Sequence, residues 1–198
     1  MTALWFPLEG AVSRLVHLHT GETVEAGLLG NDSVLGLSIA LGATHAFGVT
    51  TVQIGGSALC ISAADFNEHI RGRDGVVLHA LLRYANLYMD VLGQLTACHA
   101  LHRIEQRLSR CILTLFDYSG EAPLRVTHDT LADFLGVHRP SVTYALQALG
   151  AAGAVGSERR RIIVRDRQAL AKHVCECYNV IRTTTHRELE RIARLTRG

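Results

Sequence analysis

Apolar and polar positions along the chain follow two different periods, and the change between them lies near residue 75. In residues 1–62, short apolar runs alternate with turn residues, as in "AVSRLVHL", "TVEAGLL", "GVTTVQI" and "SALCIS". Alternation between turns in this manner is typical of β-strands. Gly55 and Gly56 form the turn between the last two runs, and Ser62 and Asp65 are residue types that begin helices. We therefore expect an α+β protein that starts with a β-roll or β-sandwich.

From about Val76 to Ala97, apolar residues recur at alternating spacings of three and four. The stripe consists of Leu78, Leu81, Ala85, Tyr88, Leu92, Leu95, His99 and His102. This spacing is that of a heptad seam, which packs one helix against another. Either the segment is an ordinary core helix, or its seam packs against a second copy of the chain. We favour the second arrangement and predict a homodimer whose interface runs from Leu78 to His99.

The stretch "THDTLADFLGVHRPSVTYALQALGAAG", residues 127–153, contains two apolar helical patterns that meet at Gly136. Thr127 is a capping residue type and predicts a helix over residues 128–135. Gly136 supplies the positive φ angle that a tight turn between helices needs. Pro140 suits the first turn of the following helix, where its missing N–H costs nothing. These signals predict a helix-turn-helix in preference to a generic helical hairpin.

Polar residues stand at the start of the second predicted helix, the part of a helix-turn-helix that enters the major groove of DNA. Arg139 is suited to a bidentate contact with guanine O6 and N7. Ser141 and Tyr144 share its face and are expected to reach base edges or phosphates. We predict that these three residues read the base sequence. The alternative is that Arg139 is merely solvated.

The segment "GAVGSERRRIIVRD" predicts a strand, a charged turn and a strand, which is the wing of a winged helix. Arg159, Arg160 and Arg161 at its tip are expected to contact phosphates. Residues 1–138 contain 8 Lys/Arg against 13 Asp/Glu, whereas residues 139–198 contain 12 against 5. Clustered cations displace counterions from nucleic acid, so this asymmetry suits a polyanion-binding surface and equally suits a basic tail that only adds solubility.

A further helix is expected over roughly residues 103–116, and "DYSGEAP" then interrupts the helical period with Gly120 and Pro123. We place a domain boundary at this interruption. The predicted units are a β-roll sensor-like domain (1–75), a dimerisation helix and hinge (76–120), and a winged helix-turn-helix DNA-binding domain with a C-terminal helical extension (121–198).

Composition and the lack of certain motifs argue against a membrane-spanning protein, a secreted protein and several classes of enzyme. No apolar run is long enough for a transmembrane helix, and the first ten residues lack the pattern of a signal peptide. We therefore expect a cytoplasmic protein whose five cysteines are thiols. The sequence contains no P-loop, no G-x-S-x-G elbow, no paired-carboxylate motif and no H-E-x-x-H motif, so we predict that it is not an enzyme.

The predicted order of β-roll, long dimer helix and winged helix-turn-helix resembles the cyclic-AMP receptor protein (Crp/Fnr) family of bacterial transcription regulators. The resemblance is strongest over "RLSRCILTLFDYSG", "LRVTHDTLADFLGVHRPSVTYALQALGAAGAV" and "RRRIIVRDRQAL". It is weaker over "FPLEGAVSRL", "TGETVEAGLLGNDSVLG" and "GGSALCIS". It implies a roll of the cyclic-nucleotide-binding type and a homodimer on two-fold-symmetric DNA. It also implies backbone-contacting roles for Thr127, His128 and His138, and we predict the same role for Thr143.

The sequence departs from the cyclic-nucleotide-binding members of that family in several places. Leu37 follows Gly36 where those members have a glutamate, and the Arg-Ser pair that holds the phosphate falls near Ala46-Phe47. The long helix offers Leu92-Gly93 where they place hydroxyls. A phosphate buried without a charged partner is costly, so we expect no cyclic AMP binding and no cofactor. The roll also starts late, so its first strands are expected to be missing.

Two further departures concern iron and DNA. The first cysteine is Cys60, so the N-terminal cysteine cluster of the iron-sulfur members is not present. Pro140 stands where many relatives have glutamate, and Tyr144 where many have arginine. Because proline cannot accept a hydrogen bond from cytosine N4, we expect a half-site different from the best-known family sites.

Cys98, His99, His102 and Cys111 lie along one helical region, and a thiol with an imidazole suits zinc or haem. We nevertheless predict no metal site, because both histidines continue the apolar seam.

The C-terminal extension is expected to be a single basic helix, from about Gln168 to Arg197, capped by Asp166. Cys175 and Cys177 lie within it. Side chains two residues apart diverge on a helix, so we do not expect this pair to bind a metal together. A redox switch is the alternative role for these thiols.

The leading hypothesis is a sequence-specific transcription regulator that acts as a homodimer on an inverted-repeat DNA site without cyclic AMP. RNA polymerase is a further candidate partner, and no membrane contact is expected. One alternative is a regulator that senses an effector or redox state through a metal, haem or another small ligand. The other is a dimeric protein-interaction module, for which DNA binding would be weak and indifferent to sequence.

Overall fold

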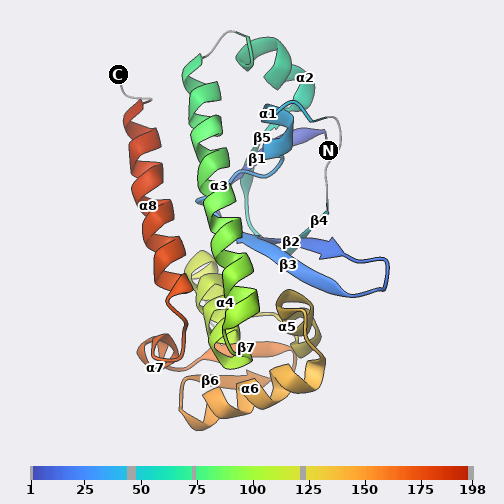
Figure 1. The fold of residues 1–198 in the computed structure, drawn as a ribbon, viewed down its shortest axis with the longest axis vertical. Helices are drawn as coiled ribbons and strands as arrows, with labels where there is room; N and C mark the ends of the chain where they lie inside the picture. The colour runs from blue at the N-terminus through green and yellow to red at the C-terminus, as the bar shows by residue number, and fades with distance from the viewer. Residues whose placement is uncertain (1, 44–47, 73–74, 121–123, 196–198) are drawn as a thin grey trace.

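The computed structural model describes residues 2–43, 48–72, 75–120 and 124–195. A β-rich N-terminal part leads into a long central helix, and a mostly helical part lies below it in Figure 1. The N-terminal elements are β1 (Ala3–Pro7), β2 (Ala11–His17), β3 (Thr23–Leu29), α1 (Leu37–Ala40), β4 (Val49–Ile54), β5 (Ala58–Ser62), α2 (Ala63–Asp65) and the π-helical turn η1 (Phe66–Ile70). None of the described helices is long and apolar enough to cross a membrane.

The N-terminal strands form two small antiparallel sheets, one with the order β3-β2-β4 and one that pairs β1 with β5. The four strands expected in residues 11–62 are present, and β1 adds a strand that the apolar pattern did not predict. The Gly55-Gly56 turn links strands of different sheets. A Cβ on Gly56 would lie 2.1 Å from the Glu9 carbonyl oxygen, so only glycine fits there. Ser62 caps α2 as expected, because its Oγ accepts the Asp65 N–H.

The remaining elements follow after residue 74. They are α3 (Gly75–Leu101), α4 (Ile104–Ser119), α5 (His128–Leu135), α6 (Arg139–Ala151), β6 (Val155–Glu158), β7 (Arg161–Val164), α7 (Arg167–Ala171) and α8 (Cys177–Leu195). Arg103 has extended backbone angles and separates α3 from α4, and the Gln106 side chain accepts its N–H. This break is the hinge between the long helix and the C-terminal part.

Helix α4 belongs to the C-terminal core rather than to the dimerisation segment. Its Leu108, Ile112 and Leu115 are fully buried in one cluster with side chains of α5, α6, β7 and α7. The boundary near residue 120 stays a prediction, and α4, which precedes it, packs in the same core as α5, α6, β7 and α7. Gly120 ends α4 with a φ of 61°, and Pro123 lies outside the described residues.

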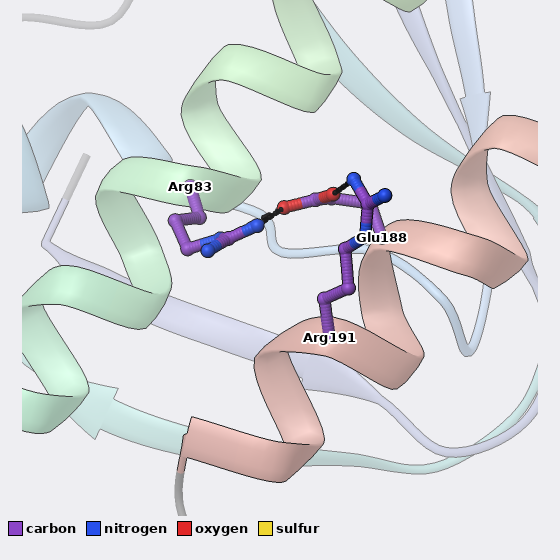
Figure 2. Close-up of polar contacts among 3 residues, drawn as sticks. All are labelled: Arg83, Glu188 and Arg191. Atoms are coloured by element: carbon purple, nitrogen blue, oxygen red, sulfur yellow. Dashed lines mark hydrogen bonds and ion pairs between the residues drawn. The ribbon is translucent and has the colours of Figure 1, made fainter.

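The C-terminal extension consists of two helices, not one. Asp166 caps α7 as expected, because its Oδ1 accepts the N–H groups of Gln168 and Ala169. The chain then leaves helical geometry over residues 172–176, and α8 runs back antiparallel to α3 (Figure 1). Figure 2 shows the ion pair that holds them: Arg83 Nε lies 2.8 Å from Glu188 Oε1, and Arg191 contacts the other carboxylate oxygen at 3.3 Å.

The predicted dimer seam of α3 is directed largely into the same chain. Leu81, Ala85 and Leu95 are buried, while Leu78, Tyr88, Leu92 and His99 are half-buried. The same chain thus covers Leu81, Ala85 and Leu95, and the role of the seam as a partner-facing surface stays a prediction. A different stripe is open to solvent: Leu82, Asn86, Met89 and Gly93.

One buried pair of opposite charges joins the β-rich part to α4. Glu25 of β3 and Arg110 of α4 are 3% and 4% exposed. Burial raises the pKa of Glu25 to about 7, against a smaller opposing effect of the Arg110 charge. The pKa of Glu25 in the folded chain lies above the ordinary value of 4.5. The folded chain therefore keeps the Glu25 proton over a pH range in which the unfolded chain releases it.

We predict that stability falls as pH rises from about 4.5 to about 7, by roughly 3 kcal/mol from Glu25 alone. Urea unfolding at pH 5 and pH 8 measures this loss. Glu25→Gln imitates the protonated form and should remove most of the difference, whereas Glu105→Gln on the exposed face of α4 should not. Equal pH dependence in both variants and the parent chain would contradict a raised Glu25 pKa.

Candidate nucleic-acid interface

Helices α5 and α6 form the predicted helix-turn-helix, and α5 has the boundaries that the sequence predicted. Thr127 Oγ1 accepts the Thr130 N–H at 3.1 Å and caps α5. Gly136 ends α5 with a φ of 60°, and the Val137 N–H returns to the Ala132 carbonyl. The turn also packs closely against the N-terminal part, because a Cβ on Gly136 would lie 3.3 Å from Val24 Cγ2.

The apolar face of α6 is buried, which directs its polar face outward. Val142, Ala145, Leu146 and Leu149 fill the core side. His138 is the N-cap, and Pro140 lies in the first turn. Arg139 and Tyr144 are exposed, the latter to 71%, and Ser141 is half-buried between them in sequence. The three residues predicted to read bases thus lie near the exposed N-terminal end of α6.

Polar contacts link the predicted DNA-contacting residues to one another. His128 Nδ1 lies 3.0 Å from Thr143 Oγ1, and Thr143 donates to the Arg139 carbonyl at 3.2 Å. His128 Nε2 lies 3.4 Å from Ser157 Oγ on β6. Arg139 Nε forms an exposed ion pair of 3.4 Å with Asp129 Oδ1. His128 therefore contacts α6 and the β6–β7 hairpin at once and aligns them.

The β6–β7 hairpin is the predicted wing. Glu158 pairs with Arg161, which leaves Arg159 and Arg160 as its two-residue tip. Arg159, Arg160 and Arg161 are all exposed. Arg160 has a φ of 58°, and among the described residues it is the only non-glycine one with a positive φ. An arginine in the left-handed region costs about 1–2 kcal/mol, so the tip combines strain with charge.

The β2–β3 hairpin approaches the interface, a feature that the sequence reasoning missed. The pKa of Glu22 at its tip is lowered chiefly by a hydrogen bond with the Thr20 side chain, and to a smaller extent by the nearby charge of His138. A pocket between this hairpin and the end of α5 is lined by Leu18, Glu22, Thr23, Val24, His99, Arg107, Leu135 and Gly136. The hairpin therefore touches the turn that positions α6.

The β-rich part contains a cavity of about 400 Å³. Its lining is Trp5, Pro7, Glu9, Ala11, Val12, Leu35, Thr50, Val52, Ile54, Gly56, Ser57 and Ala58. Glu9 is the only ionisable side chain among these described residues, and its charge would repel a phosphate. Gly36 begins α1 with a φ of 80°, and Leu37 follows it. Ala46 and Phe47, where the Arg-Ser pair was expected to fall, lie outside the described residues.

The cysteines and histidines are grouped differently from what we expected. His99 contacts Arg107, and Cys111 is buried in the C-terminal core. Cys98 and His102 instead lie beside Cys175 and Cys177. The expectation that Cys175 and Cys177 diverge on a helix is wrong, because Cys175 precedes the first residue of α8.

Comparison with known proteins agrees with this arrangement. Residues 106–173 match the family described as the Crp-like helix-turn-helix domain. A CRP-family transcriptional regulator from Thermus thermophilus is 21% identical, with a TM-score of 0.71 over 86% of this chain and 87% of that one. FixK2 from Bradyrhizobium japonicum is 18% identical, with a TM-score of 0.72 over 88% of each chain. The c-di-GMP responsive regulator CLP from Xanthomonas campestris is 17% identical, with a TM-score of 0.61 over 83% of this chain and 85% of that one.

No curated protein matches the chain by sequence. The predicted resemblance and fold class are nevertheless confirmed by the family match and the solved structures. Residues 106–173 match the Crp-like helix-turn-helix domain, and the chain has the fold of CRP/FNR transcription regulators.

We predict that Arg160→Gly lowers DNA affinity equally on all sequences and reduces the salt slope by about one charge. The same change should leave the free energy of unfolding unchanged or raise it by up to about 1 kcal/mol, because glycine tolerates a positive φ. Binding at several salt concentrations and urea unfolding measure the two effects. Arg159→Gly is the matched control: it should reduce the salt slope similarly but destabilise the fold. Equal stability changes in both variants would contradict strain at Arg160, and unchanged salt slopes would contradict phosphate contact by the wing.

Proposed function

We propose that this chain, a Crp/Fnr-type transcription regulator with a helix-turn-helix DNA-binding domain, binds an inverted-repeat DNA site as a homodimer and does so without cyclic AMP. The observation that carries the proposal is the shared exposed surface of α6 and the β6–β7 hairpin, which His128 aligns. This surface presents Arg139 and Tyr144 beside three arginines, whereas the opposite face of α6 is buried.

The residues of this surface divide into two roles. Arg139, Ser141 and Tyr144 near the start of α6 are the base-reading group, because the N-terminal end of a recognition helix reaches base edges. Thr127, His128, His138, Thr143 and Arg159 to Arg161 are the backbone-contacting group, which fixes register and supplies salt-dependent affinity. In the free chain Asp129 pairs with Arg139, and a guanine would have to replace that carboxylate.

The exposed stripe of α3 is the surface we assign to the dimer. Leu82 and Met89 are 47% and 62% exposed, and they repeat with heptad spacing together with Asn86 and Gly93. A Cβ added at Gly93 would meet nothing within 4 Å in the same chain, so a second helix can approach closely there. A two-fold arrangement of α3 places two recognition helices on one DNA duplex, which matches the symmetry of an inverted repeat.

The β-rich part is the sensor-like region of this proposal. Among the described residues, the lining of its cavity offers one carboxylate and otherwise apolar or neutral groups, which does not suit a nucleotide phosphate. The apolar lining favours a small uncharged ligand as an effector, should this part act as a sensor. Relatives of this fold include a regulator that responds to c-di-GMP, so this fold is compatible with control by small molecules.

The experiment that tests the proposal is selection of bound fragments from a random DNA pool at fixed physiological salt, with purified protein and no added ligand. An enriched inverted repeat is the expected result. Salt-sensitive binding without enrichment would contradict ligand-independent recognition. It would favour either an effector-dependent regulator or a protein-interaction module, and ligand-induced shifts in melting temperature separate those two.

For Arg139 we predict that replacement by Ala weakens binding to the selected site by about 1–3 kcal/mol and relaxes preference at one base position. Arg139→Lys keeps the charge but loses the bidentate hydrogen bonding to guanine, so it should bind random DNA normally and still lose specificity. Titrations on the selected site and on a scrambled duplex measure both. An equal loss on the two duplexes would exclude base readout by Arg139.

For the dimer we predict that Met89→Glu produces monomers by light scattering and abolishes tight binding to the inverted repeat. Two buried carboxylates facing each other across the axis are strongly unfavourable. Val180→Glu is the matched control, because Val180 is also an exposed apolar residue of a helix but lies on α8. A dimeric Met89→Glu protein would show that copies associate through another surface.

A further inference from the structure

Three thiols and one imidazole converge beside the α3–α4 hinge. The ligand atoms of Cys98, His102, Cys175 and Cys177 all lie within 4.8 Å of one another. Cys98 Sγ is 3.5 Å from Cys175 Sγ, and Cys177 Sγ is 3.6 Å from His102 Nδ1. With metal–ligand distances of about 2.0–2.3 Å, neighbouring ligands of a tetrahedral zinc ion are about 3.5–3.8 Å apart. The four side chains thus have nearly the spacing of such a site.

We propose that Cys98, His102, Cys175 and Cys177 bind one Zn²⁺ ion as a structural site of the Cys₃His type. Three thiolates and one imidazole are the ligand set of closed zinc sites, and thiolate selects zinc over hard cations. Cys98, Cys175 and Cys177 are buried and His102 is half-buried, so the site has no open position for a substrate. A role in fold stability and domain geometry therefore fits, and catalysis does not.

The surroundings of His102 are those of a metal-bound histidine. Its Nδ1 faces the thiols, while Nε2 lies 3.1 Å from Glu176 Oε2. A carboxylate on the far nitrogen fixes the tautomer and ring orientation of a zinc-ligating imidazole. Gln94 Nε2 donates to Cys177 Sγ at 3.0 Å, which is a second orienting contact. Glu176 stands between the two cysteines of "CECY", so one short segment supplies two ligands and the carboxylate.

A buried cation lies beside the cluster. Zinc with three thiolates and a neutral imidazole has a net charge of −1. The guanidinium of Arg110 is buried near Cys98, so its positive charge offsets that net charge. A disulfide between Cys98 and Cys175 would leave Cys177, His102 and Glu176 without a reason to converge on the same point.

The position of the site gives it a mechanical role. Cys98 is in the last turn of α3, and His102 is the first residue after that helix, at the hinge. Cys175 and Cys177 follow α7, whose Leu170 belongs to the core of the DNA-binding domain. A zinc ion here ties the end of the long helix to that domain and to the start of α8. It thereby fixes the angle at the hinge.

The first test measures zinc in protein purified under reducing conditions, by mass spectrometry of the metal and by titration of metal-free protein with Co²⁺. We expect one zinc per chain and the visible absorption of tetrahedral cobalt thiolate. Cys98→Ser and Cys177→Ser should lose both signals. Cys60→Ser, at an exposed site elsewhere, and Cys111→Ala, buried outside the cluster, should keep them.

A second variant tests zinc binding without removing a ligand, so its result does not depend on whether the cysteine variants fold. Glu176 is 71% exposed, so Glu176→Gln should fold normally and weaken zinc affinity about 10- to 100-fold through the loss of its contact with His102. Protein that binds neither zinc nor cobalt would overturn the proposal, and so would a Cys98–Cys175 disulfide in the isolated protein that stays metal-free after reduction. Unchanged affinity in Glu176→Gln would overturn the role of that carboxylate. None of these readouts involves DNA, so they stand apart from the proposed function.

Discussion

The buried guanidinium of Arg107 is the contact on which the position of the recognition helix depends. It extends from the first turns of α4, donates to the Leu135 carbonyl at the end of α5, and lies 2.7 Å from His99 Nδ1 of α3. Burial, together with the charges of Arg107 and Arg110, lowers the pKa of His99 to about 4. A neutral imidazole accepts a hydrogen bond from arginine, whereas a protonated one would repel it. One side chain thus joins three helices at the point where the long helix meets the helix-turn-helix.

The consequence is that the two halves of the chain are not independent modules. Ala11 and Leu15 of β2 lie in the same hydrophobic cluster as the buried residues of α4, α5 and α6. Val24 packs against Gly136, and Glu25 faces Arg110. A ligand that moved β2 or β3 would therefore act directly on the turn between α5 and α6. Allosteric control of this kind needs two states in which the ligand makes different contacts. The β2–β3 hairpin is the element shared by a ligand site in the β-rich part and the turn between α5 and α6.

Local signals in the sequence were sufficient for the DNA-binding domain. Thr127, Gly136 and Pro140 each satisfy a backbone requirement within a few residues, so they predicted both helices of the motif correctly. The orientation of α3 was not predictable in this way. A helix with apolar residues around most of its circumference contains more than one heptad stripe, and the period alone does not tell which stripe the same chain covers. The apolar seam we chose, with Leu81, Ala85 and Leu95, is the covered one.

The cysteine cluster could not be predicted from the sequence either, because its members lie far apart along the chain. Cys98 and Cys175 are 77 residues apart, and nothing near either residue indicates the other. The helical pattern from Gln168 onward contains no proline or glycine at residues 172–176, so the break before α8 had no local signal. Only this break turns Cys175 toward Cys177, and only the return of α8 along α3 brings both to Cys98. The ion pair between Arg83 and Glu188 near the far ends of α3 and α8 (Figure 2) and the thiol cluster at the near ends therefore act together. They hold α8 on a face of α3 that neither the β-rich part nor the open stripe uses, which leaves that stripe available to a second chain.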